Sequence, residues 1–259
     1  MTLAEQVLQL KTDIDEVYKA GKKATGGVVE CDIDHEELYN NGYSEGYDVG
    51  FDAGYNEGQE NMPNLIEQAS VVQFPNCNVF GKAEVELNLG EQLTTLANFI
   101  TVTTESNKNT ILEHLTITCS GLPKSMQNFM NCNYQYRDTV LKKITLNFNT
   151  ENVTNFSNTF NCLTALEEID GTPLDLSLAT NVSNIFNYNL ALKEVRFKAN
   201  SIKLSIYFAA SSLLSTISLQ SIIDGLATVT TKQTLTLHSS VSVTDEQVVS
   251  ASGKNWEIV

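Results

Sequence analysis

Histidine and cysteine supply many of the nucleophiles, bases and metal ligands of enzymes, and this chain of 259 residues has three histidines and five cysteines. None of His35, His114 and His238 stands at a metal-ligand spacing or beside a cysteine or serine in a known nucleophile motif. The odd number of cysteines, without a C-x-x-C pair, fits neither a disulfide framework nor a zinc site. No P-loop, H-E-x-x-H or strand-linked G-x-G-x-x-G occurs. We therefore predict that the protein is not an enzyme and has no catalytic residues, no metal site and no cofactor.

The net charge is −15, from 16 basic and 31 acidic side chains. Such a chain lacks the basic surface that nucleic acids and anionic membranes attract. No apolar run approaches the roughly 20 residues of a membrane span. We predict neither nucleic-acid binding nor membrane insertion. Residues 1–60 hold 14 acids and 4 bases, a net charge of −10, which distinguishes this segment from the rest of the chain.

A repeated pattern occupies the larger part of the sequence. Five segments with the start Leu-x-x-(Leu, Ile or Val) align without gaps, and four of them carry a third apolar residue two places on; they begin at Leu112, Leu141, Leu166, Leu192 and Leu214. Their starts are 29, 25, 26 and 22 residues apart, which is the period of leucine-rich repeats with some longer loops. We predict that each segment is a strand with its apolar residues directed inward, and that neighbouring strands pair in parallel.

A second apolar marker follows the first four starts, at Phe129–Cys132, Thr159–Cys162, Ile185–Tyr188 and Tyr207–Ala209. Stacking would bury both apolar rows against each other, so the marker is predicted to form the opposite wall of the core. Cys132 and Cys162 share one repeat position, which favours small buried side chains over reactive thiols.

The end of the chain has the pattern of a cap. Thr244 and Gln247 form a capping box that predicts a helix through Ala251, ended by Gly253, and Trp256 begins a last strand. A cap keeps the final repeat from exposing its core and its unpaired edge. We expect Trp256 to be a structural plug rather than a ligand site.

The amino-terminal segment differs from the repeats. Apolar residues at alternating spacings of four and three predict a coiled-coil-like helix over residues 1–24, joining two or three copies of the chain: Leu3, Val7, Leu10, Ile14 and Val17. A short amphipathic helix lying on its own globular domain has the same pattern and stays an alternative.

Within residues 25–60 an aromatic residue and a glycine each recur every four positions, at Tyr43, Gly46, Tyr47, Gly50, Phe51, Gly54, Tyr55 and Gly58. Because four exceeds the 3.6 residues of a helical turn, both stripes would wind around a helix in a right-handed sense, and glycine lets partner backbones approach closely. We predict a second self-associating helix, with a flexible acidic linker as the alternative.

These motifs resemble a known family. The repeat starts, the marker Asn158–Cys162 and the Thr- and Asn-rich spacing are similar to BspA-type leucine-rich repeats, which occur on bacterial surface proteins and in phage proteins. The closing segment Ser221–Val259 resembles the last repeat of such proteins encoded by gut phages and prophages, and Val17–Lys23 resembles their amino-terminal head. The resemblance covers most of residues 84–259 and this short head, and it implies a leucine-rich-repeat solenoid in a virion. The Gly/Tyr tract departs from the commonest head, so the resemblance identifies no particular attachment site.

Two groups of residues are candidates for binding. On the predicted strands, one outward column carries charges of alternating sign, at Glu113, Lys142, Glu167 and Lys193. The binding candidates are the other outward charged residues: His114, Lys143, Glu168, Glu194 and Arg196. This face is either a solvated ladder of ion pairs or a surface that recognises a host glycan or protein. The second group is Tyr134 and Tyr136, in the longest insertion between repeats.

The sequence therefore predicts an α/β repeat protein: a helical oligomerisation head, a parallel-stranded solenoid and a carboxy-terminal cap. Its expected parts are a coiled-coil-like helix (1–24), an acidic Gly/Tyr segment (25–60), a connector (61–83), the solenoid (84–220) and the capping repeat (221–259). The predicted function is that of a structural or adhesive virion protein, made in the bacterial host cytoplasm and placed in a tail, baseplate or head fibre. Its expected partners are itself, other virion proteins and a host-surface glycan or protein. The alternatives are a bacterial surface adhesion protein and a purely architectural virion spacer.

Overall fold

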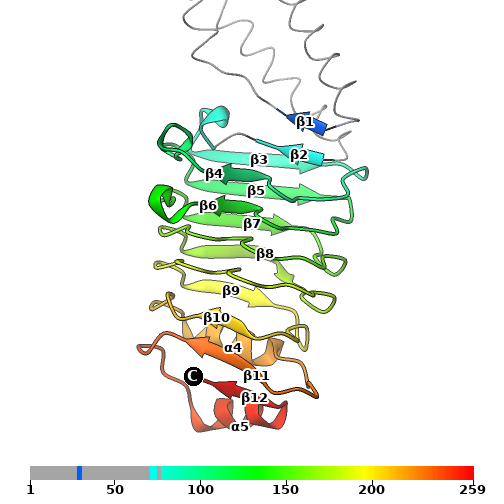
Figure 1. The fold of residues 1–259 in the computed structure, drawn as a ribbon, viewed down its shortest axis with the longest axis vertical. Coiled ribbons are helices and arrows are strands. Elements are labelled where there is room, and N and C mark those ends of the chain that lie inside the picture. The colour runs from blue at the N-terminus through cyan, green and yellow to red at the C-terminus, as the bar shows by residue number, and fades with distance from the viewer. Residues whose placement is uncertain (1–27, 31–70, 75–76) are drawn as a thin grey trace, which may run out of the picture.

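The computed structural model describes residues 28–30, 71–74 and 77–259 (Figure 1). The predicted helix over residues 1–24 lies outside the described residues. So does the aromatic and glycine repeat from Tyr43 to Gly58. The interpretation of both as oligomerisation segments stays a prediction.

The described part of the chain is an α/β structure in which every strand pair is parallel. Its main sheet has the order β3 (Glu84–Leu89), β5 (His114–Cys119), β7 (Lys143–Asn147), β8 (Glu168–Leu174) and β9 (Glu194–Phe197). Smaller sheets pair β1 (Val28–Glu30) with β2 (Val71–Gln73), β4 (Ile100–Val102) with β6 (Met130–Cys132), and β10 (Ile206–Phe208) with β11 (Gln233–Leu237) and β12 (Trp256–Ile258). The described helices are α4 (Thr216–Gly225) and α5 (Asp245–Gly253), with short 3-10 turns at η1 (Cys77–Phe80), η2 (Glu105–Asn107) and η3 (Tyr134–Tyr136).

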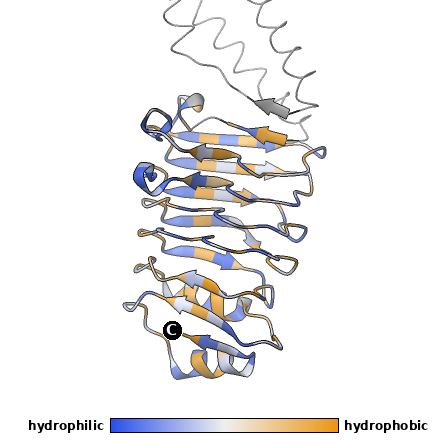
Figure 2. Cartoon of the chain, in the orientation of Figure 1, coloured by the Kyte–Doolittle hydropathy of each residue, from blue (hydrophilic) through white to orange (hydrophobic). Residues whose placement is uncertain are grey.

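The strands of the main sheet lie one beneath another along the long axis of the molecule, and α4, α5 and β10 to β12 close its carboxy-terminal end (Figure 1). Hydrophobic and hydrophilic residues alternate along these strands (Figure 2). In β5 the alternation places Leu115, Ile117 and Cys119 inside and the residues between them at the surface. Buried side chains of successive strands therefore stack on one another, because a parallel register with period two keeps one face turned inward.

A second wall faces this sheet across the core. It consists of β4, β6, residues 159–162, residues 185–188 and β10, and its first four segments are joined in order by backbone hydrogen bonds such as Met130 N to Thr159 O and Phe160 N to Ile185 O. Six phenylalanines of the core form one column along the stack, with ring centroids of neighbours 4.7 to 5.9 Å apart: Phe74, Phe99, Phe129, Phe160, Phe186 and Phe208. All six are buried, so the prediction that the marker fills the opposite wall is confirmed for its four phenylalanines. It is wrong for the marker residues Tyr188 and Tyr207, which are 40% and 49% exposed.

Asparagines hold the turns that lead into this wall. Asn98, Asn128, Asn158 and Asn184 all have a φ of 54° to 56°. Asparagine tolerates this left-handed conformation better than most residues. The amide of each donates to the side-chain oxygen of the one before it, at 2.9, 3.0 and 3.1 Å. Asparagine therefore recurs in these turns for two reasons: it tolerates the left-handed backbone, and its side chain bonds to the asparagine of the neighbouring repeat.

One predicted strand is wrong. The pattern of Leu214–Leu219 predicts a fifth repeat strand, but the helix α4 begins at Thr216. This helix also crosses the predicted boundary between the solenoid, ending at residue 220, and the capping repeat, beginning at residue 221. Ser215 caps the helix by accepting the N–H of Ser218 at 3.0 Å, and Leu219, Ile222 and Ile223 are buried. Ser215, Thr216 and Ser218 would be the outward residues of such a strand. Because they do not lie on a strand, the outward columns of the sheet end at β9.

The hydroxyls of α4 explain why a helix can follow β9. Ser218 Oγ accepts the N–H of Val195 at 2.9 Å and donates to its carbonyl at 3.0 Å, and Ser221 Oγ accepts the N–H of Phe197 at 3.0 Å. The edge of β9 is therefore hydrogen-bonded by side chains instead of by another strand, which leaves no open edge there.

The strand β8 contains an irregularity that accounts for the one repeat without a third apolar residue. Its register with β9 pairs Ile169 with Val195 and then Leu174 with Phe197, so the segment between Ile169 and Leu174 bulges outward. Gly171, at the position of the missing apolar residue, has a φ of +92°, and a Cβ there would lie 2.4 Å from the carbonyl oxygen of Leu146. Leu174, which is 1% exposed, supplies the buried side chain.

The carboxy-terminal cap agrees with the prediction. Both hydrogen bonds of the Thr244–Gln247 capping box are present at the start of α5, which ends at Gly253, and β12 begins at Trp256. Trp256 is 3% exposed and its Nε1 donates to the carbonyl of Ala227 at 2.8 Å. This tryptophan therefore packs as part of the core.

Candidate binding surface

The outward face of the main sheet carries two columns of charged side chains. The first lies immediately before the strands and consists of Glu113, Lys142, Glu167 and Lys193. Lys142 Nζ lies 2.6 Å from Glu113 Oε2, and Lys193 Nζ lies 2.6 Å from Glu167 Oε2. Hydrogen bonds and charge from these lysines lower the pKa of Glu113 and of Glu167. Because all four side chains are between 41% and 49% exposed, solvent and salt screen these pairs.

The second column contains four of the predicted binding residues. The strand register places Glu84, His114, Lys143, Glu168 and Glu194 next to one another in that order. Lys143 Nζ lies 3.0 Å from Glu168 Oε2 and 3.0 Å from Asp170 Oδ2, and hydrogen bonds to these two carboxylates raise the pKa of Lys143. His114 Nδ1 lies 3.3 Å from Glu84 Oε1. Arg196, exposed on β9, follows Glu194 on the same face.

These distances bear on the two interpretations of the charged face. Most of its cations are already paired with carboxylates of the neighbouring strand, as an ion-pair ladder requires. Among the described residues, Glu194 and Arg196 take part in no ion pair and remain the part of this face that is open to a ligand.

The structure separates the two predicted tyrosines. Tyr134 is 55% exposed, whereas Tyr136 packs against the hydrophobic core. Tyr134 instead contacts Tyr188, a residue that sequence reasoning placed in the core marker: the ring centroids are 4.7 Å apart with an angle of 50° between the planes. The guanidinium carbon of Arg137 lies 5.4 Å from the centroid of the Tyr134 ring. This cluster belongs to the second wall, so the tyrosines and the charged columns are two separate surfaces.

A signal for Tyr188 exists in the sequence. It stands at the marker position that Cys132 and Cys162 occupy in the two preceding repeats. Those cysteines are buried, but a tyrosine is too large for the same space, and Tyr188 is 40% exposed. A large aromatic residue at a repeat position that holds a small residue in the other repeats therefore indicates a side chain at the surface.

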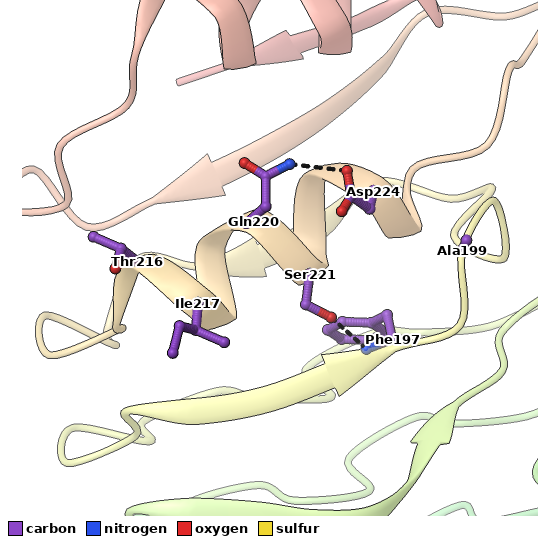
Figure 3. A pocket seen from close by; sticks show the side chains of 7 residues that line it. All are labelled: Phe197, Ala199, Thr216, Ile217, Gln220, Ser221 and Asp224. Atoms are coloured by element: carbon purple, nitrogen blue, oxygen red, sulfur yellow. Dashed lines mark hydrogen bonds between the residues drawn. The ribbon is translucent and has the colours of Figure 1, made fainter.

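A groove of about 510 Å³ lies where the main sheet gives way to α4 (Figure 3). It is lined by Phe197 and Ala199 on one side and by Thr216, Ile217, Gln220, Ser221 and Asp224 of α4 on the other. Several of its polar groups already have partners: Ser221 accepts from the Phe197 backbone, and Gln220 Nε2 donates to Asp224 Oδ1 at 2.8 Å. These hydrogen bonds hold the helix in place and engage the same groups that a ligand would need.

A row of buried polar residues was missed by sequence reasoning. Asn109, Asp138 and Asn189 each stand three residues before a repeat leucine and are at most 2% exposed. Asp138 Oδ1 accepts the N–H groups of Val140 and Leu141 at 2.7 and 2.8 Å, and its Oδ2 accepts from Asn109 Nδ2 at 2.8 Å. Burial raises the pKa of Asp138 against the opposing effect of these hydrogen bonds. The sequence signal for these buried polar residues was their constant position, three residues before a repeat leucine.

Two further kinds of reactive side chain lie among the described residues: His238, whose Nδ1 lies 2.8 Å from Ser240 Oγ, and four cysteines. Cys77, Cys119, Cys132 and Cys162 are free and buried, and burial raises the pKa of each thiol. Within residues 28–30, 71–74 and 77–259, no three histidine, cysteine or acidic side chains lie together in a way that would hold a metal ion. In the same part of the chain, no helix has the length and hydropathy needed to cross a bilayer.

Comparison with known proteins finds no matching family model, no matching curated protein and no matching solved structure.

Proposed function

We propose that this chain is a non-enzymatic structural or adhesive virion protein, in which a BspA-type leucine-rich-repeat solenoid is presented at the surface of a phage tail, baseplate or head fibre. The observation that supports this best is the uninterrupted parallel stack from β3 to β9, whose register lines up outward side chains strand by strand. Such a stack is a rigid scaffold with a long surface, and repeat proteins commonly bind through surfaces of this kind.

The ends of the stack fit this role. The serines of α4 satisfy the edge of β9, and α5 packs against the last strand, β12, whose Trp256 is buried. A capped end opposes edge-to-edge aggregation, so the domain can project from a particle as a separate unit. Attachment is proposed for the amino-terminal segment, because the heptad from Leu3 to Val17 and the repeat from Tyr43 to Gly58 have the spacing of self-associating helices. Two or three copies would then present several weak sites at once, and linked sites gain avidity.

Electron microscopy of phage particles labelled with a gold-conjugated antibody against this chain tests the proposal. We expect gold at one defined position of the particle. The same antibody, used on particles from a strain whose gene for this chain is deleted, is the control. Absence of the chain from purified particles, with the chain found on the bacterial surface, would instead support the bacterial adhesion protein.

The architectural spacer is the second candidate, since most charges of the sheet face are already paired within the chain. Binding of the fluorescently labelled full chain to host cells separates it from the adhesive role. Saturable binding supports adhesion, and a particle-bound chain that shows no binding to host cells supports a spacer.

A further inference from the structure

The exposed tyrosine pair of the second wall has the composition of a ligand site. Tyr134 comes from η3 and Tyr188 from the turn at residues 185–188, and their rings meet at 4.7 Å although both remain substantially exposed, at 55% and 40%. Residue 188 lies two repeats along the stack from residue 132, so Tyr134 reaches across the intervening repeat to make this contact. The contact leaves parts of both aromatic rings open to solvent.

The backbone of Tyr188 shows that this arrangement has a cost. Its φ is 59°, in the left-handed region. Cys162, at the same position of the preceding repeat, has a φ of 61°, so the left-handed turn belongs to the repeat. There the side chain is a small buried cysteine, whereas a bulky aromatic residue is rare in this conformation and strained. Because the Tyr188 ring is not buried, packing in the core does not offset the strain, which favours a role for the exposed ring.

One cationic group contacts the rings, and an amide side chain precedes Tyr188 in the sequence. Arg137 lies over Tyr134, with its guanidinium carbon 5.4 Å from the ring centroid, and it takes part in no ion pair among the described residues. Asn187, next to Tyr188, ends a row of amides in which Asn161 donates to Asn131 at 2.9 Å and Asn187 donates to Asn161 at 3.1 Å. Since no further asparagine continues the row, the side-chain oxygen of Asn187 has no hydrogen-bond donor in the described part of the chain.

We propose that Tyr134, Tyr188, Arg137 and Asn187 form a binding site for an acidic glycan, that is, a pyranose that carries a carboxylate. This inference rests on the proposed adhesive function and names the ligand class of that function. The apolar C–H face of the sugar packs on the tyrosine rings, the guanidinium binds the carboxylate, and the Asn187 oxygen accepts a sugar hydroxyl.

The charge of the chain favours an anionic ligand at this place. Residues 61–259 hold 17 acids and 12 bases, so most of this surface repels a carboxylate. An unpaired guanidinium beside two open rings therefore attracts a carboxylate to this place on the surface. The two rings are tilted by 50° to each other, so one pyranose can pack its C–H face on one ring and contact the other ring at its side, whereas an extended peptide would need a strand edge.

Calorimetric titration of the full chain tests the site. The probes are hexagalacturonate and 3′-sialyllactose, which share the carboxylated pyranose but differ in source, and the methyl ester of hexagalacturonate is the uncharged control. We expect saturable binding of at least one acidic probe. If hexagalacturonate binds, we expect its methyl ester to bind at least tenfold more weakly. Absence of binding for both acidic probes overturns the proposal. So does equal binding of a hexaglutamate peptide, because it assigns the surface to acidic peptides.

Four variants locate the binding. Tyr134→Ala and Tyr188→Asn are each expected to weaken binding of the acidic probe at least tenfold, and Arg137→Gln to remove the preference for the acid over the ester. Tyr207→Ala changes a tyrosine that is 49% exposed outside the pair and is expected to leave binding unchanged. Tyr188→Asn also separates binding from folding, because asparagine relieves the left-handed strain and its melting temperature should equal or exceed that of the wild type. Unchanged affinity in Tyr134→Ala and Tyr188→Asn overturns the assignment.

The outcome is distinguishable from a failure of the proposed function. If a variant that combines Tyr134→Ala with Tyr188→Asn still binds host cells as the wild type does, the adhesive function stands and this site is wrong. If the acidic probe binds at the tyrosines while the chain is absent from purified particles, the site stands and the virion assignment is wrong.

Discussion

A single buried carboxylate has a large structural role in this molecule. Asp138 accepts three hydrogen bonds, from the backbone N–H groups of Val140 and Leu141 and from the side chain of Asn109, while it is 2% exposed. Asp138→Ala leaves the two backbone N–H groups without an acceptor and removes one of the two acceptors of the Asn109 amide, which also donates to the Leu112 carbonyl. We expect a loss of about 1–3 kcal/mol in the free energy of unfolding. Urea denaturation measures it, with the exposed Glu91→Ala as the matched control. A loss no larger than that of the control would show that the hydrogen bonds of Asp138 do not support the turn.

The same carboxylate predicts a dependence of stability on pH. Burial raises the pKa of Asp138 in the native state above its ordinary value of 3.8. The native state therefore holds the proton more tightly than the unfolded chain, so the stabilisation from this group is complete below about pH 3.8 and is lost as the pH rises through the native pKa.

Asp138→Asn tests this dependence, because asparagine keeps the acceptor oxygen and cannot ionise. We expect the stability of the wild type relative to Asp138→Asn to fall as the pH rises from 3 to 7 in a series of urea titrations. A relative stability that rises over this range would contradict a raised native pKa.

At the scale of elements, α4 protects the edge of β9 through two serine hydroxyls. Ser218→Ala removes the partner of both the N–H and the carbonyl of Val195 at a site that is 0% exposed. We expect a cost of about 1–3 kcal/mol in the free energy of unfolding, and more aggregation by light scattering when Ser221→Ala is added. Thr216→Ala, on the exposed side of the same helix, is the control. Wild-type stability in Ser218→Ala would mean that burial of the apolar face of α4 is sufficient.

The bulge in β8 depends on one glycine. Gly171→Ala forces a side chain into a φ of +92° and toward the carbonyl oxygen of Leu146, so we expect a loss of at least about 1–3 kcal/mol in a thermal or urea unfolding experiment. Gly253→Ala is the matched comparison: it lies in the last turn of α5, its Cβ would meet nothing within 4 Å, and alanine should stabilise the helix by about 0.5–1 kcal/mol. Equal effects of the two substitutions would contradict the role of Gly171 in the bulge.

For the whole molecule, the net charge of −10 in residues 1–60 predicts how the chains associate. Like charges would repel if residues 1–60 of several copies associate as proposed, and added salt screens that repulsion. We expect sedimentation to show a dimer or trimer whose dissociation constant falls as salt is added, and a monomer when residues 1–60 are deleted. An oligomer that persists after the deletion would place the interface in the repeats.

Local spacing in the sequence was sufficient to predict much of the fold. The Leu-x-x-Ile pattern and the Phe marker identified the two buried walls, because burial on a strand follows a period of two. Thr244 with Gln247 identified the start of α5, because a capping box joins two residues three positions apart. The same alignment of the repeats predicted that His114 and Lys143 are neighbours on the outward face of the sheet.

Other features were decided only by the tertiary structure. Leu214–Leu219 has the pattern of a repeat strand, yet it enters a helix, because its serines can bond the edge of β9 and that edge is formed by a distant part of the chain. The contact between Tyr134 and Tyr188 likewise depends on how many residues each turn of the stack contains. The sequence by itself determined which side chains of strands such as β5 and β7 face the core, since that depends on spacing along one strand. The tertiary structure decided where the sheet ends and which surface residues meet, since these depend on neighbours that only stacking brings together.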